Sequence, residues 1–148
     1  MALVPQQFLR RPSERASETL HVTVIFTSVA ATLAALKQAG SLARGLDARI
    51  TLVVPQVVPY PLPLEEPSPP VEFNERRFHL IAGGISIPTS VRIYLCRDRI
   101  ETLRGVLDRS SIILVAGPKR RWWPAREQRL AKTLRRAGFD VIFRPITA

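Results

Sequence analysis

An apolar run from Ser111 to Ala116, SIILVA, limits the possible folds of this chain more than any other stretch. It is short and rich in β-branched residues, as is typical of a strand buried on both faces of a parallel sheet. Gly117 and Pro118 end the run. A helical pattern then extends from Pro124, which suits the first turn of a helix, to Gly138, which suits its end. The stretch therefore predicts a strand, a loop and a helix of an α/β sheet.

Other parts of the chain repeat this alternation. Further strands are predicted at His21–Thr27, Arg49–Val54, Val91–Cys96 and Phe139–Phe143. Helical patterns separate them, and this order of elements predicts three α/β/α layers around a five-stranded parallel sheet. The last strand is apolar and ends at Pro145, so we expect it to pair with a second copy of the chain.

The predicted helices have recognisable ends and apolar faces. Thr27 or Ser28 can cap the first helix. Val71–Ala82 and Arg99–Leu107 are predicted to form two more. The apolar face of the first helix is predicted to contain Leu33, Leu36, Gly40, Ala43 and Leu46, and that of the second Phe73, Arg77, Leu80 and Ile81.

Two segments fall outside this alternation. Residues 1–19 mix charged and polar residues with two prolines, so we expect a flexible tail before a domain that spans residues 20–148. Seven prolines lie between Pro55 and Pro70, which argues against both a helix and a central strand. We expect a long loop there, either a surface excursion or a lid over the strand ends.

The formal net charge is +10, and most of it lies in one segment. Between Lys119 and Arg136 there are eight basic residues and one acidic residue, Glu127, which gives 8 − 1 = +7. Such a field attracts phosphate ligands, nucleic acid or an anionic membrane surface, and it does not choose among them. For the arginines of the predicted helix, a solvated outer face is the simpler interpretation.

No pattern of catalytic or metal-binding residues is present. His21 and His79 lack neighbours at metal-ligand spacing, and we interpret both as structural. Cys96 is the only cysteine, which fits a reducing compartment, and we interpret it as buried and inert. We therefore expect a cytoplasmic protein that is not an enzyme, binds no metal and has no transmembrane segment.

Two stretches resemble the universal stress protein family. They are VTVIFTSVAATLAALKQAGSLARGLDARITLVVP, residues 22–55, and VRIYLCRDRIETLRGVLDRSSIILVAG, residues 91–117. The resemblance implies a strand order of 3-2-1-4-5 and an adenine nucleotide pocket at the ends of the first and fourth strands. It also implies a homodimer formed through the fifth strand, Phe139–Phe143.

The chain departs from the family's nucleotide motif, which is Gly-x-x-Gly, nine residues, and then Gly-Ser or Gly-Thr. Only Gly117 matches, since Arg120 occupies the second glycine position and the later pair falls on Leu130 and Ala131. Thr27 replaces the aspartate that contacts adenine in the family. Glycines let backbone amides approach phosphates closely, so the sequence predicts a degenerate nucleotide pocket.

The loop GPKRRWWPAREQRL, residues 117–130, resembles the basic, tryptophan-containing loop of the stress-protein-like domain in potassium-sensing histidine kinases. Those domains are regulatory and some bind a cyclic dinucleotide, although the serine-rich motif that favours this ligand is absent here. ATP, AMP and a cyclic dinucleotide are therefore the candidate ligands, and no cofactor is certain.

The sequence leaves two functions open. In the first, a non-catalytic regulatory domain holds an anionic ligand on basic side chains, and Trp122 or Trp123 stacks on a base or packs against another surface. In the second, the chain is a dimeric scaffold whose basic face binds an acidic protein. A third function, nonspecific nucleic-acid binding through the same face, is disfavoured because such a sheet presents no element that reads a groove, and we expect no specific nucleic-acid partner. The candidate ligand-binding residues are Thr27, Ser28, Val53, Gly117, Lys119, Arg120, Arg121 and Trp122.

Overall fold

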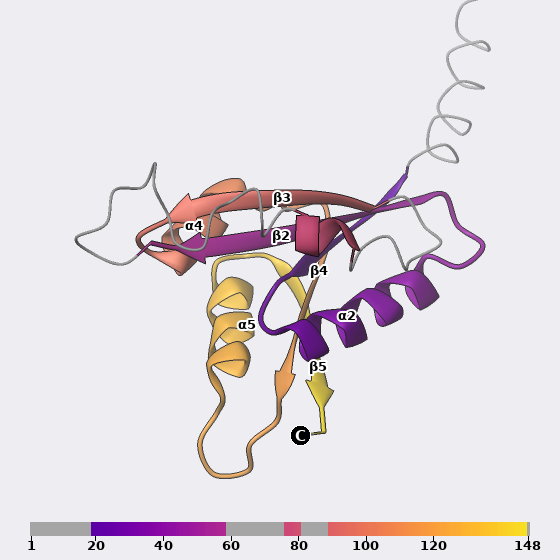
Figure 1. Ribbon diagram of the computed structural model, residues 1–148. Coiled ribbons are helices and arrows are strands. Elements are labelled where there is room, and N and C mark those ends of the chain that lie inside the picture. Colours follow the sequence, from indigo (N-terminus) through magenta and orange to yellow (C-terminus); the bar gives the residue numbers. More distant parts are fainter. Residues whose placement is uncertain (1–18, 59–75, 81–88, 148) are drawn as a thin grey trace, which may run out of the picture.

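The computed structural model describes residues 19–58, 76–80 and 89–147, which contain a parallel sheet of five strands (Figure 1). The strand order is β3-β2-β1-β4-β5, so the predicted α/β architecture and the order 3-2-1-4-5 are confirmed. Residues 1–18 of the predicted tail lie outside the described residues. The strands are β1 (Leu20–Ile25), β2 (Ala48–Val57), β3 (Thr89–Cys96), β4 (Ile112–Pro118) and β5 (Asp140–Ile146).

Helices cover the two faces of the sheet with separate cores. Helix α2 (Val29–Leu42) shares one buried cluster with Phe78, which belongs to the helical residues 76–80. Helices α4 (Arg99–Val106) and α5 (Arg126–Arg136) share the other cluster. The sheet is therefore the middle layer of three, as the sequence predicted.

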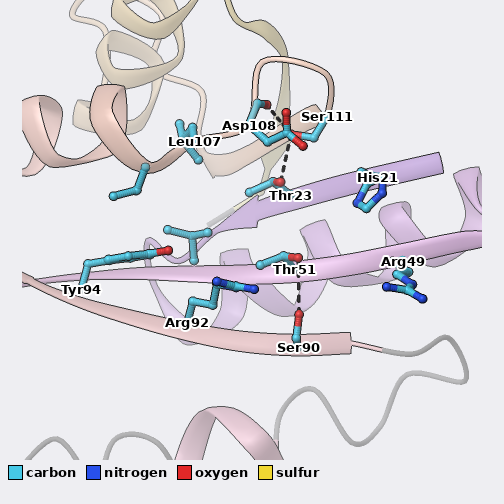
Figure 2. A pocket seen from close by; sticks show the side chains of 12 residues that line it. His21, Thr23, Arg49, Thr51, Ser90, Arg92, Tyr94, Leu107, Asp108 and Ser111 are labelled. Atoms are coloured by element: carbon cyan, nitrogen blue, oxygen red, sulfur yellow. Dashed lines mark hydrogen bonds between the residues drawn. The ribbon is translucent and has the colours of Figure 1, made fainter. Parts of the chain in front are cut away.

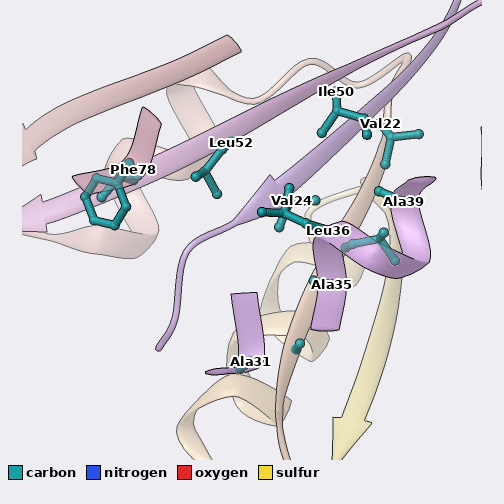
Figure 3. Packing of buried hydrophobic residues seen from close by; sticks show 12 residues of the cluster. Val22, Val24, Ala31, Ala35, Leu36, Ala39, Ile50, Leu52 and Phe78 are labelled. Atoms are coloured by element: carbon teal, nitrogen blue, oxygen red, sulfur yellow. The ribbon is translucent and has the colours of Figure 1, made fainter. Parts of the chain in front are cut away.

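Small residues form the buried face of α2 (Figure 3). The predicted face is partly wrong, because Leu33 is 36% exposed and Leu46, beyond the helix end, is 60% exposed. Alanines let the helix axis approach the sheet closely, where the side chain of Leu33 would separate the two layers. The buried residues of the helix are Ala31, Thr32, Ala35, Leu36 and Ala39. Ser28 is the N-cap, as predicted, because its hydroxyl accepts a hydrogen bond from the Ala31 amide at 3.2 Å.

The helical residues 76–80 pack through Phe78 and not through the residues that the sequence favoured. Phe78 is buried, and its ring meets that of Phe26 edge to face with 4.6 Å between centroids. Leu80 is 81% exposed and Arg77 is exposed, so the predicted apolar face is wrong at both positions. Phe73 and Ile81 lie outside the described residues. One aromatic contact thus outweighs the helical periodicity here.

Strands β2 and β4 continue past the end of β1, and each contains a proline there. Pro55 pairs with Tyr94 in the interior strand β2, so the prediction that prolines exclude a central strand from residue 55 on is wrong there. The C=O of Val53 accepts a hydrogen bond from the Phe26 amide, so Pro55, two residues later, faces the same side, where β1 has ended. A missing N–H costs nothing in that position. Pro118 in β4 has the same relation to β1, because the C=O of Ala116 accepts from the Thr27 hydroxyl.

Two predicted boundaries also move. Helix α5 begins at Arg126 after the N-cap Ala125, so Pro124 precedes the helix and is not its first residue. Strand β5 runs to Ile146 and includes Pro145, which the sequence predicted as its end. Proline is tolerated in β5 because this strand is at the edge of the sheet.

Candidate functional site

The carboxyl ends of β1 and β4 form the point where the strand order reverses, which is where open α/β sheets bind ligands. Thr27 follows β1 and connects the elements there. Its hydroxyl donates to the C=O of Ala116 at 2.8 Å, and its amide donates to the Thr32 hydroxyl at 3.2 Å. Thr27 therefore joins the end of β1 to β4 and to the first turn of α2, and its hydroxyl hydrogen is already used.

Glu127 covers the glycine that the nucleotide motif requires. Gly117 is buried, and a Cβ added to it would lie 2.5 Å from both Cβ and Cγ of Glu127. The glycine is therefore needed here for the close approach of a side chain, whereas the sequence motif associates it with the approach of a phosphate. It is the protein's own acidic side chain, from the first turn of α5, that makes this approach. A phosphate at this position would have to displace Glu127.

Gln128 binds the amides of the loop between β4 and α5. Its Oε1 accepts hydrogen bonds from the Ala125 amide at 2.7 Å and from the Arg120 amide at 3.3 Å. In a phosphate-binding loop such amides point at the ligand. Here one side chain satisfies two of them, so the backbone of this loop offers an anion less than a glycine-rich loop does.

The basic and aromatic side chains of the same loop face solvent. Lys119, Arg120 and Arg121 are exposed, as are Trp122 at 84% and Trp123 at 79%. The Arg121 guanidinium carbon lies 5.9 Å from the centre of the Trp122 ring, within the range of a cation–π contact. Figure 1 shows the loop extending away from the body of the chain. Neither tryptophan is covered by the described residues.

The eight residues predicted to bind ligand thus fall into three groups. Thr27, Ser28 and Gly117 lie at or just after the ends of β1 and β4, where the prediction placed them. Val53 is buried in the core beneath α4 and α5, where it is 4% exposed. The other four predicted residues are Lys119, Arg120, Arg121 and Trp122 on the exposed loop.

Charges of α4 and α5 meet near the covered glycine. Burial lowers the pKa of Arg99 at the start of α4, the positive charge of Arg126 lowers it further, and the charge of Glu127 opposes both. Cys96 is the last residue of β3 and lies two residues before Asp98, the N-cap of α4. Its pKa is raised mainly by burial. A buried thiol with a raised pKa is a poor nucleophile, which agrees with the interpretation of Cys96 as inert.

Sequence reasoning missed Glu127 and Gln128 as residues of the site. In the sequence, Glu127 stands out only as the one acidic residue of a basic segment. The signal that could have found both is their position in the first turn of a helix directly after the loop, where acids and side-chain acceptors favour the free amides.

Comparison with known proteins gives structural matches only. No family model matches the chain, and no curated protein matches it. Two similar solved structures are a universal stress protein in complex with cAMP and a universal stress protein from Archaeoglobus fulgidus. The first has 18% sequence identity and a TM-score of 0.56, and the match covers 88% of this chain and 100% of that chain. The second has 10% sequence identity and a TM-score of 0.61, and the match covers 88% of this chain and 97% of that chain. The chain has the universal stress protein fold.

A third structure with the universal stress protein fold, from Burkholderia pseudomallei, shows 21% identity and a TM-score of 0.56, and the match covers 88% of this chain and 98% of that chain. The fold implied by the sequence resemblance is therefore confirmed. In the described part of the chain, no helix has both the length and the apolar character needed to cross a membrane.

Proposed function

We propose that this chain is a non-catalytic regulatory domain with a degenerate nucleotide pocket. In this proposal it binds an anionic ligand through side chains of the loop from Lys119 to Trp122. The observation that carries the proposal is the contact of Glu127 with Gly117, because it fills the place in which a glycine-rich loop would receive a phosphate. The hydrogen bonds from Arg120 and Ala125 to Gln128 support it, since they occupy amides of the same loop.

Exposed cations replace the missing amides in this proposal. Lys119, Arg120 and Arg121 are exposed and close together in sequence, and they can form charge-assisted hydrogen bonds with phosphate oxygens. Trp122 offers a ring on which a base can stack. ATP, AMP and a cyclic dinucleotide are the first candidates. The structural neighbour that is in complex with cAMP adds this cyclic nucleotide to the set to be tested.

The test is a thermal-shift titration of the full chain with ATP, AMP, cAMP and cyclic di-AMP. A ligand at a hundred times its dissociation constant stabilises the folded state by about 2.7 kcal/mol, which is a measurable rise in Tm. We expect the variant K119A/R120A/R121A to lose this rise. A control with equal loss of charge, R129A/K132A/R136A on the outer face of α5, should keep most of it.

Two results would contradict the proposal. Unchanged melting for all four nucleotides would remove the ligand and favour a scaffold that binds an acidic protein. A rise in Tm that survives in K119A/R120A/R121A would place the ligand elsewhere.

We also propose a homodimer formed through β5. This strand is at an edge of the sheet, and Ile142, Phe143 and Ile146 are partly buried there. Pairing with a second copy would remove the open edge. Light scattering coupled to size-exclusion chromatography should give twice the mass of the 16.6 kDa chain. The substitution of Ile142 by lysine should reduce that mass to one copy, and a monomeric parent chain would refute the dimer.

A further inference from the structure

A polar cavity of about 340 Å³ lies on the sheet face that carries α4 and α5, away from the covered glycine (Figure 2). Its floor is made by β1, β2 and β3, and one wall is made by the connection between α4 and β4. Helix α4 has only eight residues, and among the residues that the structure describes none covers the outer side of this floor. The floor residues are His21, Thr23, Arg49, Thr51, Ser90 and Arg92.

The strand register arranges the floor in rows across the sheet. His21 pairs with Arg49 in the first row, and Thr51 lies between Thr23 and Ser90 in the second. Arg92 pairs with Val53 in the third. The hydroxyl row thus has a cation on either side. The Cα atoms of Arg49 and Arg92 are about 13 Å apart along the strands, at roughly 3.3 Å per residue, a span that two arginine side chains can close around one anion.

The two arginines are available for a ligand. Both are exposed, and within the described part of the chain neither forms a hydrogen bond or an ion pair. The nearest acid in the cavity wall is Asp108, whose carboxylate accepts two hydrogen bonds from Ser110, at 2.9 Å from its amide and 2.7 Å from its hydroxyl. The charge of His21 acts on Asp108. The arginines therefore have no acidic partner within this surface.

The hydroxyl groups divide into used and available donors. Thr23 donates to the Ser111 hydroxyl at 3.0 Å, and Ser111 donates to the C=O of Asp108 at 2.7 Å, so both hydrogens are used. Thr51 and Ser90 lie 3.4 Å apart and share one hydrogen bond. Whichever of them accepts keeps its own hydrogen, so the centre of the floor has one free O–H donor between two guanidinium groups.

We propose that this cavity binds a small phosphate monoester, with the phosphate above Thr51 and Ser90 and between Arg49 and Arg92. Two guanidinium groups and a hydroxyl donor match the acceptor oxygens of a phosphate. The organic part of the ligand lies toward Leu107 and Tyr94, which line the same cavity. The carboxylate of Asp108 also lines the cavity and would repel a second phosphate group near it. The cavity therefore favours a monophosphate.

This site is separate from the proposed loop site. It extends from the amino-terminal ends of the strands, at His21, Arg49 and Ser90, to Tyr94 in β3, whereas Gly117 and the loop lie at the carboxyl end of β4. Of the residues predicted from the sequence to bind ligand, the cavity includes only Val53. Each site can therefore be removed by substitutions that do not touch the other.

The test is an NMR titration of the full chain labelled with nitrogen-15, using ribose 5-phosphate as the probe and ribose as its uncharged control. We expect saturable shifts of the Thr51, Ser90 and Arg92 amide signals with ribose 5-phosphate and none with ribose. R49Q/R92Q should weaken binding at least tenfold. T51V, which keeps a β-branched residue in the strand, should weaken it by a smaller factor. The loop variant K119A/R120A/R121A should leave the affinity unchanged.

Three outcomes would overturn the proposal. The first is the absence of saturable shifts at these amides up to millimolar probe. The second is an affinity that R49Q/R92Q does not change, and the third is equal binding of ribose. The two arginines are exposed, so their substitution should not unfold the chain; an amide spectrum of the variant that overlays the parent spectrum outside the cavity verifies this.

Discussion

The side chain of Glu127 lies directly on Gly117, so closely that a methyl group on the glycine would be 2.5 Å from Cβ and Cγ of the glutamate. Gly117 is in β4 and Glu127 is in the first turn of α5, on either side of the basic loop. The contact sets how closely α5 approaches the end of β4. It also places a carboxylate where the glycine would otherwise be open to a ligand.

G117A should therefore destabilise the fold, by about 1–3 kcal/mol, as an overpacked core does. E127A should not relieve this loss in the double variant, because Cβ of residue 127 already lies 2.5 Å from the added methyl. E127G should relieve it, after allowance for about 1 kcal/mol lost from helix propensity. Urea unfolding of the two double-mutant cycles measures these differences.

The control for this cycle is G105A in α4. Gly105 is exposed and has no atom within 4 Å of an added Cβ. Alanine should stabilise the helix there by about 0.5–1 kcal/mol. If G117A were as harmless as G105A, the close contact with Glu127 would be refuted.

T27V should cost about 1 kcal/mol, because it removes the hydrogen bond from Thr27 to the C=O of Ala116 and leaves that acceptor unpaired. T27D, which installs the residue of the family motif, should cost more, since a carboxylate would face the same C=O. Adenine nucleotide affinity should not improve in T27D, because Glu127 still covers Gly117. Thermal unfolding and a nucleotide titration of both variants test this; an affinity gain in T27D alone would argue for an open cradle.

Q128A should release the loop amides. The amides of Arg120 and Ala125 lose their common acceptor, so their hydrogen exchange should become faster while exchange in β4 stays slow. Q128E, which keeps an acceptor oxygen and adds a charge that favours the helix amino terminus, should retain the protection. Exchange measured by NMR residue by residue makes the comparison. Unchanged exchange in Q128A would mean that the amides are protected by something else.

The carboxylate of Asp108 should titrate below its ordinary value. Hydrogen bonds from the hydroxyl and amide of Ser110 lower its pKa from 3.8, and the charge of His21 contributes. A lowered pKa in the folded state stabilises the fold above the ordinary pKa, and this contribution is lost as the pH falls through the folded value. S110A should raise the pKa toward 3.8. Carbon-detected NMR titration follows the carboxyl directly, and an identical midpoint in S110A would exclude the hydroxyl as the cause.

The strands could be predicted because apolar residues recur in short runs or at alternate positions between polar turns, and their order followed from the resemblance to the universal stress protein family. Their ends were less accurate, since β2 and β5 continue as long as a neighbouring strand offers hydrogen bonds, even through Pro55 and Pro145. The buried face of α2 was predicted in part because the pattern favoured large residues such as Leu33. The residues of α2 that pack against the sheet are mostly alanines, and a search for large apolar residues at helical spacing does not find them.

The candidate sites could be predicted only where a motif position exists. Gly117 and Thr27 were found through the family motif, whereas Glu127 acts through a contact that no spacing rule contains. The cavity beside Arg49 and Arg92 did leave a signal in the sequence. Polar and apolar residues alternate in HVTV, RITL and SVRIY, which indicates strands with one uncovered face. The regular alternation of strands and helices in the rest of the chain instead favours a sheet covered on both faces, which obscures this signal.

Pro55 and Pro118 limit how far β1 could be lengthened by substitution or insertion. Both neighbours of β1 carry a residue without an N–H on the side that faces the space beyond Ile25. A longer β1 could not accept a backbone hydrogen bond from either strand at these prolines, whatever side chains followed Thr27. The main chain thus limits how far β1 can pair with its neighbours, and this limit would persist even if every charged residue of the adjacent loop were exchanged.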